Sequence, residues 1–123
     1  MLSTARIVAF VAAADPDRAR RFYVETLGLP LLADEPFALV FDANGVMLRV
    51  QKVAAVAPAP HTVLGWNVPD VRAAVAALAA KGVAFERFDG MSQDAHGIWT
   101  SPSGACIAWF KDPDGNLLSL TQP

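Results

Sequence analysis

Two stretches of the chain carry apolar residues at the spacing of an amphipathic helix. The first helix is predicted to begin at Asp15, whose carboxylate can cap free backbone N–H groups, and to end at Gly28. The second is predicted between Asp70 and Gly82 on the same signals. The stripes that we expect to be buried are Ala19, Phe22, Tyr23, Thr26 and Leu27 in the first helix and Val71, Ala74, Val75, Leu78 and Ala79 in the second.

Runs of β-forming residues flank both predicted helices. They cover residues 7–11 and 62–68 before the helices, and residues 29–32 and 83–88 after them. Each half of the chain then ends in a predicted hairpin, built from residues 37–41 and 46–51 in the first half and from residues 106–110 and 117–121 in the second. This order predicts an α+β fold made of two β-α-β-β-β modules.

The internal spacing indicates a repeat with unequal halves. The helix-capping residues Asp15 and Asp70 are 55 positions apart, whereas the turn glycines Gly45 and Gly115 are 70 apart, so the second module carries about 15 extra residues. We place this insertion at residues 89–104. The predicted organisation is a single domain with module one at about 1–53, an Ala- and Pro-rich linker at 54–60 and module two at about 61–123.

Composition and charge narrow the class of protein. The chain has 123 residues, of which 54% are hydrophobic and 18% charged, and this balance is typical of one compact domain that needs no disulfide or structural metal. A single Cys favours a reducing compartment, so we expect a cytoplasmic protein. A net charge of -2 without a basic run argues against nucleic acid as a partner, and no segment is apolar for long enough to span a membrane.

Three short motifs add a family resemblance to this pattern. They are Phe22-Tyr23, the tripeptide at 27–29 and the segment from Lys111 to Asn116 before the last strand. Combined with the paired modules, they resemble the vicinal oxygen chelate superfamily, which holds glyoxalases, bleomycin-resistance proteins and extradiol dioxygenases. The resemblance covers nearly the whole chain. It implies that each module curls its sheet into half of a barrel-like cup with the helices outside and the ligand site on the concave face, and that the protein forms a homodimer.

Metal-dependent members of this superfamily take ligands from the first and last strands of each module, usually His or Gln on the first and Glu on the last. The family's spacing puts these four positions at Val8, Arg49, Val63 and Ser119. Valine has no donor atom, Arg49 carries a permanent positive charge, and a neutral hydroxyl alone is a weak ligand. We therefore expect no metal and no other cofactor, and we do not expect metal-dependent glyoxalase or dioxygenase activity.

Strand alternation predicts which other side chains share the concave face with those four positions. They are Arg6, Phe10, Met47, Gln51, Gly65, Asn67, Leu117 and Thr121. The opposite set is expected to pack under the helices and comprises Ile7, Val11, Leu48, Val50, Leu64, Trp66, Leu118 and Leu120.

Arg49 needs a partner, because a charge on an otherwise apolar strand face must be paired or reach solvent. A bound carboxylate or phosphate would satisfy it through a bidentate contact. An internal salt bridge to an acid such as Asp94, or exposure at the rim, would satisfy it equally well, and the sequence leaves these interpretations open.

The insertion gathers Gln93, Asp94, His96 and Trp99, a polar set with an aromatic residue, and long irregular connections of this kind are often lids or binding loops. The alternative is a solvated loop in which Trp99 is a hydrophobic anchor. Cys106 is interpreted as a small buried residue rather than a nucleophile.

We therefore expect a metal-free protein that binds a small organic ligand in the cup, with Arg49 suited to an anionic group. The predicted ligand-binding residues are Arg49, Gln51, Asn67, His96, Trp99, Trp109 and Ser119. One alternative is a glyoxalase-like lyase or isomerase that uses His96, Asp94 or Arg49 in place of a metal. Another is a purely structural module with a filled cup.

Overall fold

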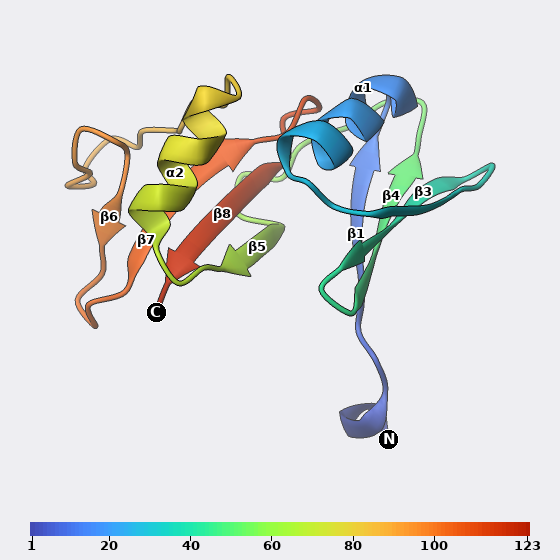
Figure 1. Cartoon of the computed structure of the whole chain (residues 1–123), viewed down its shortest axis with the longest axis horizontal. Helices are drawn as coiled ribbons and strands as arrows, with labels where there is room; N and C mark the ends of the chain where they lie inside the picture. The colour runs from blue at the N-terminus through green and yellow to red at the C-terminus, as the bar shows by residue number, and fades with distance from the viewer. The chain divides into compact units, whose positions relative to one another are not determined.

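The computed structural model describes all residues, 1–123, and the chain divides into two compact units, Met1–Pro58 and Ala59–Pro123. Each unit contains one four-stranded mixed sheet with a helix on one side (Figure 1). The boundary falls inside the Ala- and Pro-rich segment 54–60. Both sheets are open, with two edge strands each, so neither closes into a barrel.

The N-terminal unit has the strand order β1-β4-β3-β2, in which β1 runs parallel to β4 and the other pairs are antiparallel. Its elements are η1 (Leu2–Thr4), β1 (Val8–Ala13), α1 (Pro16–Arg21), η2 (Phe22–Thr26), β2 (Leu31–Asp34), β3 (Ala38–Ala43) and β4 (Val46–Lys52).

The predicted first helix is present, but it changes type halfway. The carboxylate of Asp15 accepts a hydrogen bond from the Arg18 N–H at 3.1 Å and so caps the start of α1. From Phe22 onward the chain widens into the π-helical segment η2, which the N–H of Leu27 closes by donating to the Phe22 carbonyl at 3.0 Å. Tyr23 in this segment is buried, and its ring lies 5.7 Å from that of Phe41.

The C-terminal unit repeats the topology in the order β5-β8-β7-β6, with β5 parallel to β8. Its elements are β5 (Leu64–Asn67), α2 (Val71–Ala80), β6 (Trp99–Thr100), β7 (Cys106–Lys111) and β8 (Leu117–Gln122). Helix α2 packs on β7 and β8, where Ala108, Phe110 and Leu118 are buried (Figure 1). Neither this helix nor any other has the length and apolarity that crossing a bilayer would require.

The second module departs from the prediction at its edge strand. A continuous extended run was expected at 83–88, but only an isolated bridge joins Phe85 to Phe110 there. The chain then leaves the sheet and returns at Trp99, which pairs with Ile107 as part of β6. The insertion therefore interrupts the strand that corresponds to β2, because its extra residues must loop out before the edge pairing can resume.

Burial along the strands follows the predicted alternation. Val11, Leu48 and Val50 are buried, whereas Phe10 and Met47 on the other face are 51% and 42% exposed. Ile7 departs from the prediction: it was expected in the core but is 76% exposed, because β1 begins only at Val8. Leu117 and Ser119, which were assigned to the cup face, are buried.

Candidate functional site

Two tryptophans share the face of the C-terminal sheet that α2 does not cover. Trp99 is paired with Ile107, and Trp109 is paired with Ser119, in antiparallel register. Directly opposed residues in such a pair project from the same face of the sheet. The indole rings lie 6.2 Å apart with a tilt of 40°, and Phe88 meets the Trp109 ring edge-on at 5.4 Å. We call the surface formed by Trp99, Trp109, Ser119 and Asn67 the aromatic face.

Polar groups on strands β5 and β8 complete the aromatic face. Gly65 is paired with Ser119, and Asn67 is paired with Thr121. The Ser119 side chain is buried against the bare Gly65 backbone, since a Cβ at position 65 would lie 2.6 Å from the Ser119 Oγ. The Ser119 hydroxyl and the exposed Asn67 amide form no hydrogen bonds within the chain, so both can bond a ligand.

Arg49 and Gln51 lie on the N-terminal sheet and share one face with Phe10, which is beside Arg49 in the parallel register of β1 and β4. The Arg49 Nη1 donates to the Glu35 Oε1 at 3.1 Å. Of the interpretations left open by the sequence, the structure shows an internal salt bridge, and its acid is Glu35 instead of Asp94. A guanidinium has five N–H donors, so one bond to Glu35 leaves others for an anionic group.

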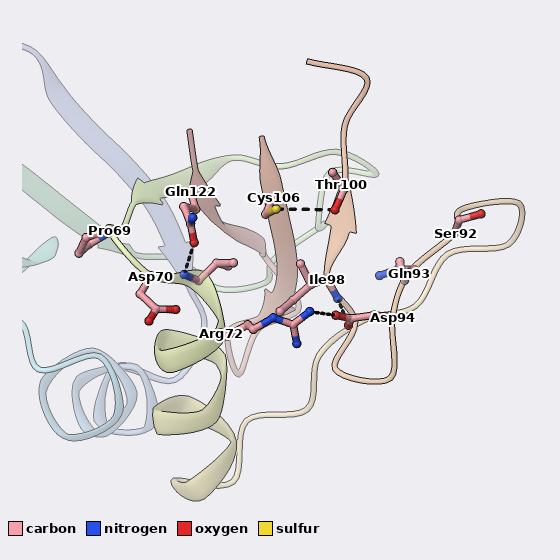
Figure 2. A pocket seen from close by; sticks show the side chains of 11 residues that line it. Pro69, Asp70, Arg72, Ser92, Gln93, Asp94, Ile98, Thr100, Cys106 and Gln122 are labelled. Atoms are coloured by element: carbon pink, nitrogen blue, oxygen red, sulfur yellow. Dashed lines mark hydrogen bonds and ion pairs between the residues drawn. The ribbon is translucent and has the colours of Figure 1, made fainter. Parts of the chain in front are cut away.

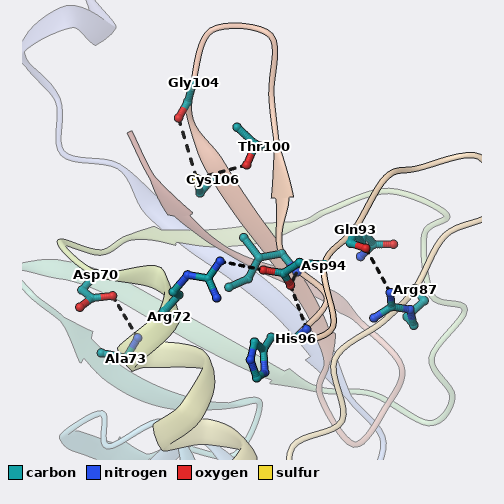
Figure 3. A network of polar contacts seen from close by, with 11 residues as sticks. Asp70, Arg72, Ala73, Arg87, Gln93, Asp94, His96, Thr100, Gly104 and Cys106 are labelled. Carbon is teal, nitrogen blue, oxygen red and sulfur yellow. Dashed lines mark hydrogen bonds and ion pairs between the residues drawn. The ribbon is translucent and has the colours of Figure 1, made fainter.

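Asp94 organises the inserted loop. Its Oδ1 accepts hydrogen bonds from the backbone N–H groups of His96 at 2.9 Å and Ile98 at 3.0 Å, and its Oδ2 accepts one from the Arg72 Nη2 at 3.1 Å (Figure 3). Partial desolvation acts to raise the pKa of Asp94, but the two N–H donors and the charges of Arg72 and His96 outweigh it. The pKa of this carboxyl therefore lies below its ordinary value of 3.8.

His96 is the one predicted site residue of the C-terminal unit that lies away from the aromatic face. It follows Asp94 in the loop beside Arg72 of α2, and its side chain is exposed (Figure 3). Trp99, Trp109, Ser119 and Asn67 are brought together on the aromatic face. Strand parity predicted a shared face for Asn67 and Ser119 only.

A hollow of about 810 Å³ opens on the other side of the C-terminal sheet, at the start of α2 (Figure 2). Strand residues of opposite parity to the two tryptophans line it, namely Thr100, Cys106 and Gln122, together with Arg72 of α2 and with Asp94 and Ile98 of the inserted loop. Its polar groups are bonded to one another: Thr100 Oγ1 lies 3.6 Å from Cys106 Sγ, and Gln122 Oε1 accepts from the Val71 N–H at 3.0 Å. Cys106 is half-buried in it and is bonded to no base that could activate its thiol.

The residues at the four family ligand positions do not fit a divalent cation. Val8 is paired with Met47, Arg49 is in an ion pair with Glu35, and Ser119 faces Gly65 and Trp109. This set offers one neutral hydroxyl and a permanent positive charge. Among residues 1–123 no group of three or more His, Cys, Asp and Glu side chains gathers in a way that could hold a metal ion.

Sequence reasoning missed Arg72, Glu35 and Phe88. Arg72 could have been singled out from the sequence, because it is the only charged residue within the Ala-rich α2. Glu35 and Phe88 could not have been, since their contacts with Arg49 and Trp109 depend on how separate strands are brought together.

Comparison with known proteins fixes the family. The sequence profile of the Glyoxalase/Bleomycin resistance protein/Dioxygenase superfamily matches residues 5–120. The chain belongs to this superfamily, as its paired modules and motifs predicted. A comparison with curated protein sequences gives no match.

Several solved structures share the fold along nearly the whole chain. A glyoxalase family protein from Enterococcus faecalis superposes with a TM-score of 0.77 at 20% identity, covering 99% of this chain and 100% of that one. Lactoylglutathione lyase from Agrobacterium tumefaciens gives 0.75 at 18% identity, covering 97% and 93%. TnmS3, an antibiotic binding protein from Streptomyces sp. CB03234, gives 0.69 at 28% identity, covering 98% of each chain.

Proposed function

We propose that this protein binds a small organic ligand with a planar aromatic group on the aromatic face, without a metal. The observation that carries the proposal is the pair of indoles, 6.2 Å apart, next to an unbonded hydroxyl on the sheet face that α2 does not cover. Aromatic pairs contribute about 0.5–1.5 kcal/mol beyond the area they bury. Ser119 and Asn67 would orient the ligand through directed hydrogen bonds.

The ligand positions and one relative support a binding protein over a metal enzyme. Val8, Arg49, Val63 and Ser119 are a poor donor set for a divalent cation. TnmS3, at 28% identity, is described as an antibiotic binding protein. Because one scaffold can serve different functions, the proposal depends on these site residues and not on the fold alone.

Arg49 and Gln51 are a separate candidate contact, on the N-terminal sheet, for an anionic group. His96 is a candidate contact on the inserted loop. The alternative of a metal-independent lyase or isomerase has less support, because two of its candidate residues are tied in ion pairs, Asp94 to Arg72 and Arg49 to Glu35.

A calorimetric titration with a panel of planar aromatic antibiotics tests the proposal. The wild type, Trp99→Ala and Trp109→Ala are compared after dialysis against a chelator. Trp66→Phe is the matched control, because Trp66 is paired with the buried Leu120 and projects from the other face. We expect saturable binding that either Trp-to-Ala change weakens about tenfold, in line with one lost aromatic contact.

Two results would contradict the proposal. One is binding that is unaltered in Trp99→Ala and Trp109→Ala but weakened in Trp66→Phe. The other is turnover of methylglyoxal with glutathione that rises and falls with a stoichiometric Ni, Zn or Fe content.

A further inference from the structure

The inserted loop closes on itself just before Trp99. Gln93 and Trp99 form an isolated antiparallel bridge, and the Asp94 N–H donates to the Ile98 carbonyl at 2.9 Å. Gly97 turns the chain between them with a φ of +82°, a conformation that other residues rarely adopt. We call residues 93–98 the strap.

A single carboxylate joins the strap to helix α2. Asp94 uses Oδ1 for the backbone of His96 and Ile98, inside the strap, and Oδ2 for Arg72, on the helix (Figures 2 and 3). The Gln93 amide secures the other end by accepting from the Phe88 N–H at 2.7 Å and donating to the Glu86 and Gly97 carbonyls at 2.9 and 2.8 Å. The strap is therefore a preformed loop with one charged attachment to the helix.

The strap ends at Ile98, the residue directly before Trp99 of the aromatic face. Ile98, whose N–H is held by Asp94, is buried on the helix side at 5% exposure. Trp99 follows immediately and projects from the other side, because successive side chains of a strand alternate between faces. Any shift of Ile98 must turn or displace Trp99 and change its packing on Trp109.

The side chains that line the hollow between the strap and α2 are better suited to attaching the strap to the helix than to binding a ligand. Arg72 is bonded to Asp94, and Thr100 to Cys106. Gln122 accepts a hydrogen bond from the first N–H of α2. Each of these side chains is thus already held by a partner within the C-terminal unit, which suits a structural role.

We propose that Arg72 and Asp94 are positioning residues that hold Trp99 in its ligand-binding orientation through the strap. The inference rests on the proposed function for its biological meaning, but the geometry it describes exists in the unliganded protein. Arg72 lies on the opposite side of the sheet from Trp99 and Trp109. It would therefore affect ligand binding without contacting the ligand.

The test uses three variants in a Trp66→Phe background, so that the remaining indoles are Trp99 and Trp109. Arg72→Met removes the guanidinium, Arg72→Lys keeps a positive charge, and Asp94→Asn keeps an acceptor for the strap backbone but removes the charge. Arg20→Met is the control, because it breaks the exposed Arg20–Asp17 ion pair of the other unit.

Two readouts need no ligand. Hydrogen exchange at the Ile98 amide reports the strap, and the exciton circular dichroism of the two indoles reports their mutual orientation. In Arg72→Met and Asp94→Asn we expect exchange to accelerate about two- to fivefold, the range of an exposed ion pair, together with a reduced exciton signal. Arg72→Lys should retain most of the wild-type signal, and Arg20→Met should match the wild type.

Binding of the dye 8-anilinonaphthalene-1-sulfonate completes the test and should weaken in the same two variants. An unchanged exciton signal in Arg72→Met would overturn the inference, and so would a loss of signal that accompanies faster exchange throughout α2 and β7, since that pattern marks general destabilisation. A wild-type protein that binds neither the dye nor any planar aromatic antibiotic would overturn the proposed function, while the exciton result would still decide the role of Arg72 and Asp94.

Discussion

At the scale of single residues, the close approach of Gly65 to Ser119 controls the shape of the aromatic face. A Cβ at position 65 would lie 2.6 Å from the Ser119 Oγ and 3.4 Å from the Ser119 carbonyl oxygen. The first distance is shorter than any ordinary contact, so the hydroxyl would have to rotate away. The absence of a side chain at position 65 thus leaves room for the Ser119 hydroxyl in its present orientation.

Gly65→Ala is therefore expected to lower the free energy of unfolding by about 1–3 kcal/mol, the usual cost of overpacking. In a Ser119→Ala background the clash is absent, and the same change should be neutral or slightly stabilising, because Ala is favoured over Gly in a strand. Chemical denaturation of the four proteins of this cycle measures the coupling. Equal destabilisation in both backgrounds would show that the hydroxyl is not the obstacle.

Asp94 gives the molecule an acid-sensitive contact. Its pKa in the folded protein is lower than the ordinary value of 3.8, so its charged form stabilises the fold. This contribution is fully present above pH 3.8 and is lost as the pH falls through the lower, folded-state pKa. The charged groups around it are Arg72 and His96, with Asp70 lining the same hollow.

Asp94→Asn should accordingly lower stability most at neutral pH, and its difference from the wild type should shrink as the pH falls below 3.8. Urea unfolding of both proteins across this range measures the effect. A stability difference between the two proteins that grows toward acid pH would mean that folding raises the pKa of the Asp94 carboxyl, which would contradict the contacts described.

At the scale of elements, helix α2 depends on its first turn. The Asp70 carboxylate accepts from the Ala73 N–H at 3.1 Å, and the Gln122 amide oxygen accepts from the Val71 N–H at 3.0 Å. Both bonds satisfy N–H groups that have no partner inside the helix.

Asp70→Ala should lower the free energy of unfolding by about 0.5–2 kcal/mol, the range of a lost N-cap, whereas Asp70→Asn should cost little because Asn caps as well. Asp89→Ala, at an exposed loop position, is the control. Thermal unfolding followed by circular dichroism distinguishes the three, and equal effects of Asp70→Ala and Asp70→Asn would argue against capping.

The elements that the sequence predicts well are those specified by local chemistry. Both helices start at a capping aspartate, and the hairpin turn at Asp42 is held by its carboxylate, which accepts from the Gly45 N–H at 2.7 Å. The interrupted edge strand at Phe85 could not be predicted in this way, because its pairing with Phe110 joins distant parts of the chain. The change to a π-helix at Phe22 was not predicted either.

At the scale of the whole molecule, the chain has the superfamily's paired sheets, and the residues at the expected ligand positions, Val8, Arg49, Val63 and Ser119, are a poor donor set for a divalent cation. Strand parity predicted that Asn67 and Ser119 share a face, but it assigned no face to Trp99 or Trp109, which the strand pairings place beside them. Parity could not predict the ion pairs Arg49–Glu35 and Arg72–Asp94. Each pair joins two separate segments, and its formation depends on the path of the loop between them.

If the protein binds no metal, as proposed, its thermal stability should not depend on the metal concentration. Thermal unfolding in the presence of a chelator, Ni, Zn or Fe is expected to give the same midpoint, because a ligand that binds only the native state must raise it by mass action. A midpoint that rises with the concentration of one of these metals would indicate a site formed by other residues.

The most direct measurement of the central claim uses the indole N–H resonances of the three tryptophans in a nuclear magnetic resonance titration. The wild-type protein is titrated with a planar aromatic antibiotic in the presence of a chelator. The proposed function predicts that the Trp99 and Trp109 signals shift together and saturate while the Trp66 signal stays in place. Shifts confined to Trp66, or shifts that require a divalent metal, would contradict it.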